Sequence, residues 1–373
     1  MRSGLLKGTA FQNPSPEWIY ENLFLVPCPE MGIMVKKAAA SRSRTPARLR
    51  TITLEEHYAS PAFLGGPGKK LREQPVLPGN AGRRNIVDEL LDLGRERIAA
   101  MDAAGIDMQV LSLTDPSVQQ LDAGASQELA REANDYLAAA VRRYPGRFAG
   151  FATLPTAAPE AAADELERMV KEHGFVGGWI NGHTRGRYLD DKSFRPILER
   201  AEALNVPLCI HPTPPPAPVI EAYYAGFSPE VTFGLSRHGW GWHIETAVHV
   251  LRLILGGAFD QFPDLQIVIG HLGESLPFMM PRLERGLPKA VTKLDRSMAE
   301  YLQENVYYSF SGFNFTPTFL DLFLQVGADR IMFSADYPYG SMAEARIFLD
   351  HLPISDADRH KIAHGNAEKL MRV

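Results

Sequence analysis

Cysteine is scarce in this chain, since its 373 residues include only Cys28 and Cys209. Two cysteines this far apart support neither a disulfide framework nor a cysteine-based zinc site, and they are typical of a reducing cytoplasm. No apolar run is long enough to cross a bilayer, and the first residues lack the charged start, apolar stretch and cleavage site of a secretory signal. We therefore expect a cytoplasmic protein that is not a membrane protein.

Excess positive charge is also lacking. Lys and Arg together number 39 against 44 for Asp and Glu, which gives a formal net charge of -5. A protein that binds nucleic acid usually presents a basic face or stripe. The composition argues against that class of protein and favours a small molecule as the partner.

Residues 1–49 differ in composition from the rest of the chain. Residues 36–50 are basic and free of acidic residues, as organelle transit segments are, but three glutamates lie between residues 17 and 30. Transit segments avoid acidic residues. We interpret residues 1–49 as an N-terminal extension that is partly irregular, and residues 50–373 as the folded domain.

Short apolar or β-branched runs recur along the folded domain. We expect strands at residues 50–56, 107–113, 148–154, 176–181, 206–211, 265–271, 306–312 and 330–336. Segments with helical spacing lie between or after them, at residues 87–105, 126–146, 159–174, 194–205, 244–257, 275–287, 316–327 and 356–373. Most of the strands are continuously apolar, which is typical of parallel strands buried on both faces.

Eight such strands alternating with helices predict an α/β fold of the (β/α)₈ TIM-barrel type. A doubly wound open sheet is the alternative, but no G-x-G-x-x-G turn follows the first strand. Residues 213–243 form a long, aromatic-rich loop inserted after the fifth strand. We interpret this loop as a pocket wall, a dimer contact or both.

The chemistry of such a barrel gathers at the carboxyl ends of its strands. The polar residues at or just after these ends are Glu55, His57, Asn181, His183, His211, His271 and Asp336. Glu55 and His57 are two apart and share a face, while Glu56 points away. Taken alone, each of His57, His211 and His271 is better explained by a structural hydrogen bond than by metal binding, so the prediction depends on several of them lying together.

Four of these side chains, Glu55, His57, His211 and Asp336, could converge on one point. Histidine and carboxylate without sulfur suit a divalent ion such as Zn²⁺ or Mn²⁺. A bound ion would also offset the unfavourable burial of these polar groups. The sequence therefore predicts one metal ion at the carboxyl end of the barrel.

Four motifs carry a resemblance to a known family. They are "EEH" at residues 55–57, "IHP" at 210–212, "GHLGE" at 270–274 and "FSADYPY" at 333–339. Together they resemble the metal-dependent decarboxylase branch of the amidohydrolase superfamily. That branch includes γ-resorcylate, 2,3-dihydroxybenzoate, 5-carboxyvanillate and aminocarboxymuconate semialdehyde decarboxylases. The resemblance runs in order through the whole folded domain.

The resemblance implies roles for particular residues. It implies Glu55, His57, His211 and Asp336 as metal ligands, Asp336, His271 and Glu274 as catalytic residues, and Arg282, Tyr339, Asn181 and His183 as substrate contacts. Arg282 would reach the site of a neighbouring subunit in a homodimer or homotetramer. In the 5-carboxyvanillate enzymes a small residue replaces the imidazole of "EEH", whereas residues 181–190 and 336–339 look closest to those enzymes, so the substrate stays open.

We therefore expect a non-oxidative decarboxylase of a hydroxylated aromatic carboxylic acid such as a salicylate, resorcylate or dihydroxybenzoate. The ion would bind the phenolate and carboxylate oxygens, and a protonated Asp336 would protonate the ring carbon before CO₂ leaves. A metal-dependent hydrolase of a lactone, amide or ester is the alternative, with His271 or Asp336 as general base. A barrel that only binds a small acid is the third possibility.

Overall fold

Short, buried, parallel strands form the centre of the domain in the computed structural model, which describes residues 48–73 and 85–373. Nine strands are assigned, and two of them, β3 and β4, together make one strand of the barrel. The strands are β1 (Ile52–Tyr58), β2 (Met108–Leu113), β3 (Phe148–Gly150), β4 (Ala152–Thr153), β5 (Gly178–Asn181), β6 (Leu208–His211), β7 (Ile267–Ile269), β8 (Val306–Ser309) and β9 (Ile331–Met332). Pairing runs β1-β2-β3 and β4-β5-β6-β7-β8-β9. Each of the eight predicted strands is confirmed.

Hydrogen bonds between main-chain atoms join the two groups of strands into a barrel. Only Phe151 separates β3 from β4, and its N–H donates to Leu111 O at 2.9 Å, so β3 and β4 form one continuous strand of the barrel. On the other side, His57 N–H donates to Tyr337 O at 2.7 Å and links β1 to the segment after β9. The (β/α)₈ barrel predicted from the sequence is therefore confirmed, and the open sheet is not.

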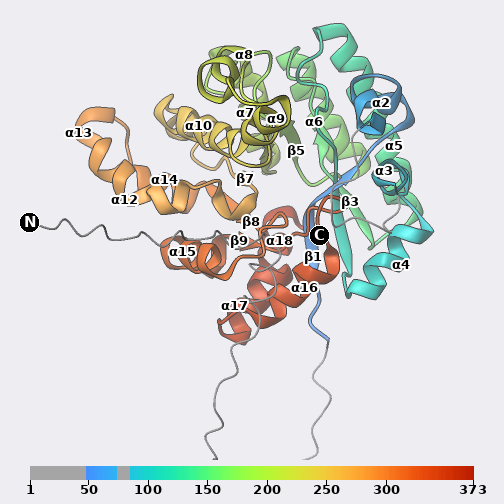
Figure 1. Ribbon diagram of the computed structural model, residues 1–373. Coiled ribbons are helices and arrows are strands. Elements are labelled where there is room, and N and C mark those ends of the chain that lie inside the picture. Colours follow the sequence, from blue (N-terminus) through green and yellow to red (C-terminus); the bar gives the residue numbers. More distant parts are fainter. Residues whose placement is uncertain (1–47, 74–84) are drawn as a thin grey trace, which may run out of the picture. The chain divides into compact units, whose positions relative to one another are not determined.

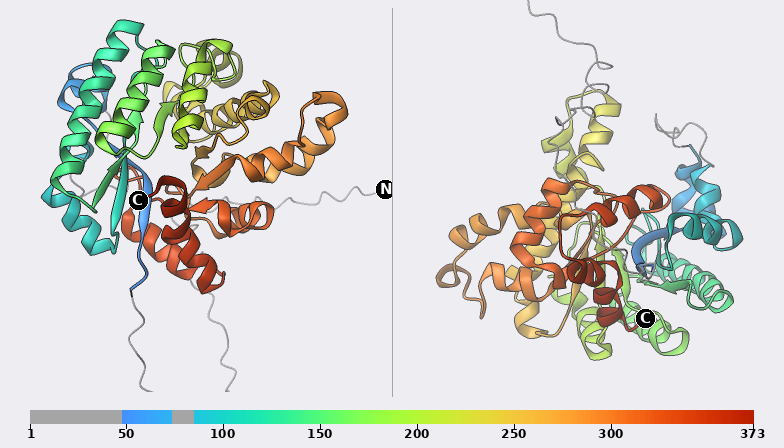
Figure 2. Two further views of the ribbon diagram at one scale, coloured as in Figure 1. Left: turned by 180° about the vertical axis from the view of Figure 1, so that it is seen from behind. Right: turned by 90° about the horizontal axis from the view of Figure 1, so that it is seen from below.

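Helices surround the strands in chain order, so that the colours of Figures 1 and 2 run around the barrel from blue to red. The α-helices are α2 (Pro61–Gly65), α3 (Ile86–Leu91), α4 (Arg95–Ala104), α5 (Ala123–Arg143), α6 (Pro159–His173), α7 (Arg195–Leu204), α8 (Ala217–Val219), α9 (Pro229–Ser236), α10 (Gly241–Leu255), α11 (Ala258–Gln261), α12 (Leu276–Gly286), α13 (Lys289–Thr292), α14 (Met298–Glu304), α15 (Thr316–Val326), α16 (Met342–His351), α17 (Asp356–His360) and α18 (Asn366–Met371). Shorter turns are η1 (Pro67–Glu73), η2 (Lys192–Phe194), η3 (Ile220–Tyr224), η4 (His271–Gly273), η5 (Ala328–Arg330) and η6 (Lys361–Gly365).

Two apolar clusters hold the barrel together. The larger one lies between the strands and the surrounding helices. The smaller one fills the barrel interior, with Leu54, Val110 and Phe151 among its members, and Met371 of α18 belongs to it. Because the interior is packed with side chains, the space for a ligand lies at the end of the barrel, as is usual in this fold.

Two expectations about helices need correction, and one longer helix was not expected. The expected helix over 87–105 is broken, because Asp92 accepts hydrogen bonds from Gly94 N and Arg97 N and so starts a new helix, α4. The connection 213–243 is not a loop but largely helical. Ser228 caps α9 by accepting a hydrogen bond from Val231 N, and Pro229 occupies its first turn. Helix α16 was not predicted.

No helix in the described part of the chain combines the length and the apolar character that a membrane span requires. The expected extension over residues 1–49 lies outside the described residues except for its last two, so its irregular structure stays a prediction.

Candidate metal centre and substrate pocket

A β-bulge in β1 turns two polar side chains into the barrel. The pairing of β1 with β2 shifts between Leu54 and Glu56, and Glu55 has a φ of 72°. Ile52 and Leu54 belong to the interior cluster, so strict alternation would turn Glu56 inward and leave Glu55 and His57 outside. The extra residue reverses the faces. Glu55 and His57 therefore share a face, as predicted, and the bulge makes it the interior face.

The four predicted metal ligands lie together at the carboxyl end of the barrel. His57 Nε2 is 3.1 Å from Asp336 Oδ1, and His211 Nε2 is 3.9 Å from Glu55 Oε1. The rings of His57 and His211 are 5.0 Å apart between centroids. Ligand atoms about 2.1 Å from a shared ion lie roughly 3 to 4 Å from one another. Each pair therefore has the spacing of two ligands of one ion, but no three of the four bring ligand atoms within 4.8 Å of one another.

Atoms without hydrogen-bond partners show that the cluster suits a cation. Glu55 Oε1 and His57 Nε2 are buried and form no hydrogen bond, although Asp336 Oδ1 lies 3.1 Å from His57 Nε2. Nδ1 of His211 lies 2.7 Å from Pro212 O, which leaves Nε2 to face the cluster. Burial raises the pKa of Glu55, and the Asp336 carboxylate adds to the rise. A divalent cation would satisfy these atoms and offset the unfavourable burial of charge.

Small residues make room for the Glu55 carboxylate. Its Oε2 accepts hydrogen bonds from Ser309 Oγ, at 3.0 Å, and from Ser311 Oγ. A Cβ atom on Gly270 would lie 2.5 Å from Glu55 Oε2 and from Ser311 Oγ. Only glycine at position 270 therefore leaves the carboxylate in place.

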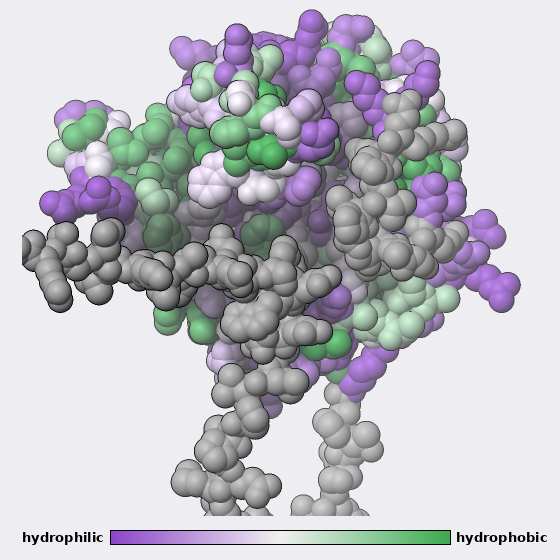
Figure 3. Space-filling model, viewed as in Figure 1, coloured by the Kyte–Doolittle hydropathy of each residue, from purple (hydrophilic) through white to green (hydrophobic). Residues whose placement is uncertain are grey.

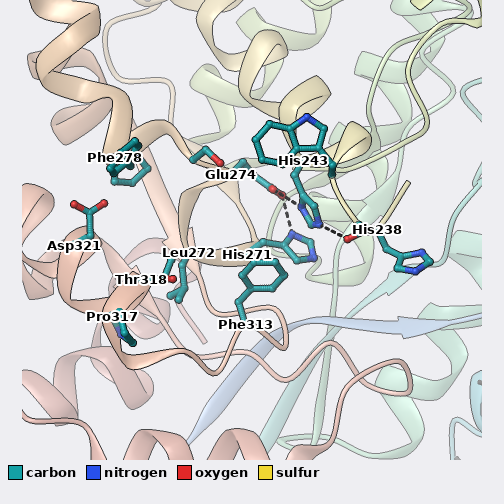
Figure 4. A pocket seen from close by; sticks show the side chains of 14 residues that line it. His238, His243, His271, Leu272, Glu274, Phe278, Phe313, Pro317, Thr318 and Asp321 are labelled. Carbon is teal, nitrogen blue, oxygen red and sulfur yellow. Dashed lines mark hydrogen bonds and ion pairs between the residues drawn. The ribbon is translucent and has the colours of Figure 1, made fainter. Parts of the chain in front are cut away.

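Glu274 holds two imidazoles beside the cluster. His271 Nδ1 is 2.7 Å from Glu274 Oε1, and His243 Nδ1 is 2.6 Å from Oε2, as Figure 4 shows. Burial alone would lower the pKa of His271, but the Glu274 carboxylate raises it to about 9. The predicted contact of His271 with Glu274 exists. His243, which sequence reasoning placed in a loop, is the third residue of α10 and completes the group.

The Glu274 group, and not the Glu55 cluster, is the set of possible ligands whose atoms all lie close to one another. Among the described residues, ligand atoms of His243, His271 and Glu274 lie within 4.8 Å of one another. Both Glu274 oxygens, however, already bond imidazole nitrogens. Glu55 Oε1 and His57 Nε2 have no such partners. The hydrogen-bond pattern therefore favours the Glu55 cluster as the cation site.

Backbone strain is concentrated around the same cluster. Residues other than glycine with positive φ there are Glu55, His271, Leu272, Glu274, Ser275, Ser311 and Asp336. Such conformations are unfavourable for residues with a Cβ, and they gather at functional sites where the surrounding structure enforces them. The strain marks this end of the barrel as the site.

A cavity of about 330 Å³ opens beside the cluster. Its lining residues are Leu71, Thr114, Asp115, His211, Phe233, Arg237, His238, Trp242, His271, Asp336 and Tyr339. Four of them come from the connection 213–243, which therefore forms part of the pocket wall as predicted. The volume is at the lower end of the range for small-molecule sites, about 300 to 1,000 Å³. It suits a compact ligand such as one substituted ring.

A second cavity, of about 470 Å³, lies against the Glu274 group (Figure 4). His271 and His238 line both cavities, whereas Phe278 and Asp321 line only the second. The Glu274 group thus lies beside both spaces.

Of the predicted substrate contacts, the structure brings only Tyr339 to the pocket. Its hydroxyl is 2.7 Å from Thr114 Oγ1. Asn181 Nδ2 lies instead 3.1 Å from His211 Nδ1. His183 faces the main chain, with Nδ1 3.0 Å from Gly186 N and Nε2 3.2 Å from a carbonyl oxygen.

Arg282 is exposed on α12 and does not line the pocket of its own chain. The predicted contact to a neighbouring subunit stays a prediction.

Glu56 points away from the pocket and holds the main chain on both sides of Asp336. Its Oε1 accepts a hydrogen bond from Ala335 N at 2.8 Å, and its Oε2 accepts one from Tyr337 N at 3.1 Å. Burial raises the pKa of Glu56 to about 7. These two hydrogen bonds fix Asp336, whose φ is 60°. Glu56 points away from the site, as expected from the sequence, but its role in positioning Asp336 was not predicted.

Arg97 of α4 supports the end of β1 on the side that faces away from the pocket, by hydrogen bonds to main-chain carbonyl groups. Its guanidinium donates to His57 O at 2.7 Å, Glu89 O at 2.9 Å and Asp92 O at 2.8 Å. The side chain is fully buried and stacks over the Tyr337 ring at 4.9 Å. A buried arginine inside a helix has no local sequence signal, so this support was not predicted.

The sequence and the fold place the chain in a known family. The Amidohydrolase family model matches residues 85–373. The chain belongs to this amidohydrolase family. Within it, the chain is similar to proteins named as aromatic acid decarboxylases. The gamma-resorcylate decarboxylase of Polaromonas sp. is 38% identical over 335 residues, which cover 86% of this chain and 98% of that relative.

Solved structures agree with this comparison. The dihydroxybenzoic acid decarboxylase of Polaromonas sp., solved with bound manganese and the inhibitor 2-nitroresorcinol, is 38% identical with a TM-score of 0.78 and covers 87% of this chain and 97% of its own. The 5-carboxyvanillate decarboxylase of Novosphingobium aromaticivorans, solved with bound manganese, is 35% identical with a TM-score of 0.78 and the same coverage. The resemblance to the aromatic acid decarboxylase branch is therefore confirmed.

Proposed function

We propose that this chain is a metal-dependent, non-oxidative decarboxylase of a hydroxylated aromatic carboxylic acid. The observation that carries the proposal is a buried cluster of His and carboxylate with unpartnered atoms, next to a cavity of about 330 Å³. The names of relatives that cover almost the same length support it.

Glu55, His57, His211 and Asp336 would hold one divalent ion, either Mn²⁺, which two similar structures contain, or Zn²⁺. When bound, the ion supplies Lewis acidity and a fixed orientation for the phenolate and carboxylate oxygens of the acid. The aromatic side chains Phe233 and Trp242 in the pocket wall exclude water and offer faces on which a ring can stack.

The proton is the reactant that the protein itself must supply. Asp336 donates it to the ring carbon that bears the carboxylate. The bond to the carboxylate then breaks, its electron pair returns to the ring, and CO₂ leaves. His271 lines the same pocket and is held by Glu274, so it stabilises charge beside the reacting carboxylate.

Product analysis tests the proposed reaction. The purified protein, incubated with dihydroxybenzoates and other salicylates, is expected to release CO₂ and the matching phenol in equal amounts and to contain about one Mn²⁺ or Zn²⁺ per chain. Gas analysis, chromatography and elemental analysis of the same batch measure all three. Turnover of lactones, amides or esters without CO₂ would support the hydrolase instead. Protein that neither contains nor takes up metal would contradict the metal site.

Arg282 would complete the pocket of a neighbouring subunit in a homodimer or homotetramer. Apolar side chains surround its exposed position, with Phe278 73% and Met279 42% exposed on α12. Figure 3 shows apolar surface over α12 and over the helical connection that includes α9. A second copy of the chain would cover such a face.

A complementation experiment tests the role of Arg282. Arg282→Ala and Asp336→Asn chains are each expected to be inactive alone. After mixing and reassembly, random pairing into dimers would restore about a quarter of the wild-type activity, because half of the dimers are hybrids and each hybrid has one intact site. Activity that stays absent after mixing, with hybrids detected by mass spectrometry, would contradict a contribution across subunits.

A further inference from the structure

An ion pair lies in the pocket wall and involves none of the residues assigned above to metal binding or proton transfer. Asp115 follows β2, and Arg237 follows α9 in the connection that covers the pocket. Arg237 Nη1 is 3.8 Å from Asp115 Oδ2. Both side chains line the cavity of about 330 Å³. The pair therefore faces the space that the proposed substrate would fill.

The neighbours of the pair hold both groups in place. Thr213 Oγ1 donates to Asp115 Oδ1 at 3.4 Å. Arg237 stacks over the Phe233 ring, with its guanidinium carbon 4.7 Å from the centroid. Burial raises the pKa of Asp115 to about 6 despite the opposing effect of Arg237. The carboxylate is 19% exposed, so a bound ligand would meet it in a largely dry environment.

Tyr339 connects this pair with the metal cluster. Its ring centroid is 5.6 Å from that of His57, and its hydroxyl is 2.7 Å from Thr114, the residue before Asp115. The pocket thus extends from the cluster along Tyr339 to Asp115. A benzoate ring whose carboxylate and ortho oxygen are held at the cluster would direct another part of its edge toward Asp115 and Arg237.

We propose that Asp115 and Arg237 select the substrate by the substituent on this part of the ring, accepting a hydroxyl group and rejecting a second carboxylate. This inference rests on the proposed function and deepens it. A carboxylate can only accept hydrogen bonds, so Asp115 suits a phenolic O–H. Asp115 repels another carboxylate in a dry pocket, and it neutralises the charge of Arg237, which would otherwise attract that carboxylate.

Selection by Asp115 distinguishes two classes of substrate, both of which occur among the similar proteins. Dihydroxybenzoates carry one carboxylate, whereas 5-carboxyvanillate carries two. The similar structures include enzymes for both classes. With Asp115 in its wall, this pocket takes the hydroxylated monocarboxylates.

Steady-state kinetics on matched acids test the selection. We would measure kcat/KM of the wild-type protein for salicylates with one further hydroxyl at each ring position, for salicylate itself and for 5-carboxyvanillate. The wild type is expected to prefer at least one hydroxylated salicylate over both salicylate and 5-carboxyvanillate by about tenfold or more, because a hydrogen bond to a charged group contributes about 1.5 to 3 kcal/mol.

Variants of the pair give the inference its sharper test. In Asp115→Asn, Arg237 keeps its charge without a partner, so the ratio of kcat/KM for 5-carboxyvanillate to that for the preferred salicylate is expected to rise about tenfold or more. The double variant Asp115→Asn with Arg237→Gln is expected to lose this gain. Asp115→Ser should move the ratio in the same direction as Asp115→Asn. Asp102→Asn, which removes a charge from a surface ion pair with Arg147, is the control and should leave the ratio unchanged.

The outcomes distinguish this inference from the proposed function. If the wild type releases no CO₂ from any of these acids, the proposed function fails. If it releases CO₂ but Asp115→Asn and Asp115→Ser, both folded by circular dichroism, leave the substrate ratio within about twofold, the selection by Asp115 is overturned. A gain in Asp115→Asn that persists in the double variant would overturn the role of Arg237.

Discussion

Replacing Asp336 with Asn is expected to lower kcat for decarboxylation by about 10³-fold while the protein stays folded. Asparagine has almost the same shape but cannot donate an acidic proton, and general acid catalysis contributes about 10² to 10⁴ in rate. The side chain lines the pocket, and its Oδ1 lies 3.1 Å from His57 Nε2. CO₂ release under saturating substrate measures kcat, and circular dichroism checks folding.

Metal content separates the two roles assigned to Asp336. A variant that keeps its ion but loses kcat would support the role as proton donor, whereas loss of the ion would support the role as ligand. Asp321→Asn is a matched control, because Asp321 lines only the second cavity. It is expected to keep activity within about twofold, as surface changes away from such sites usually do. Activity of Asp336→Asn within about tenfold of wild type would contradict both roles.

Replacing Arg97 with Leu is expected to lower the free energy of unfolding by about 3 to 5 kcal/mol, the range seen when one partner of a buried charged pair is removed. Leucine would leave the carbonyl groups of His57, Glu89 and Asp92 without their donor. It would also leave the buried Glu56 carboxylate without a nearby cation, since Arg97 counteracts the rise in pKa that burial gives Glu56.

Urea unfolding followed by circular dichroism measures this loss. Arg131→Leu is the matched control, because Arg131 is 64% exposed and its nearest carboxylate oxygen, on Glu165, is 4.0 Å away. An exposed pair of this kind contributes about 0 to 1 kcal/mol. A loss below about 1 kcal/mol in Arg97→Leu would show that Arg97 does not brace β1.

The strands could be predicted because burial on both faces leaves continuous apolar runs in the sequence. The helical connection over 213–243 could not, because its prolines and aromatic residues suggest a loop, and only the capping by Ser228 shows how α9 begins. The boundary between extension and domain, the cytoplasmic location and the choice between zinc and manganese stay predictions.

The position of the candidate site could be predicted, because the proposed ligands lie at strand ends, which a barrel brings together. Residues that act through contacts distant in sequence were missed. His243 meets Glu274 only because α10 packs beside the turn after β7, and Glu56 holds Asp336 through main-chain groups that carry no side-chain signal. His183 and Asn181 lie near strand ends but turn to the main chain and to His211.

The bulge at Glu55 makes the position of one inserted residue decisive for chemistry. The apolar first half of β1 packs the same way with or without it, so the scaffold itself does not require the insertion. Deleting Glu55 would leave Leu54, Glu56 and His57 opposite the same residues of β2, so His57 would keep its inward face and only the Glu55 carboxylate would be lost. One insertion or deletion at this position would thus add or remove one of the proposed metal ligands while the other side chains of the strand keep their faces.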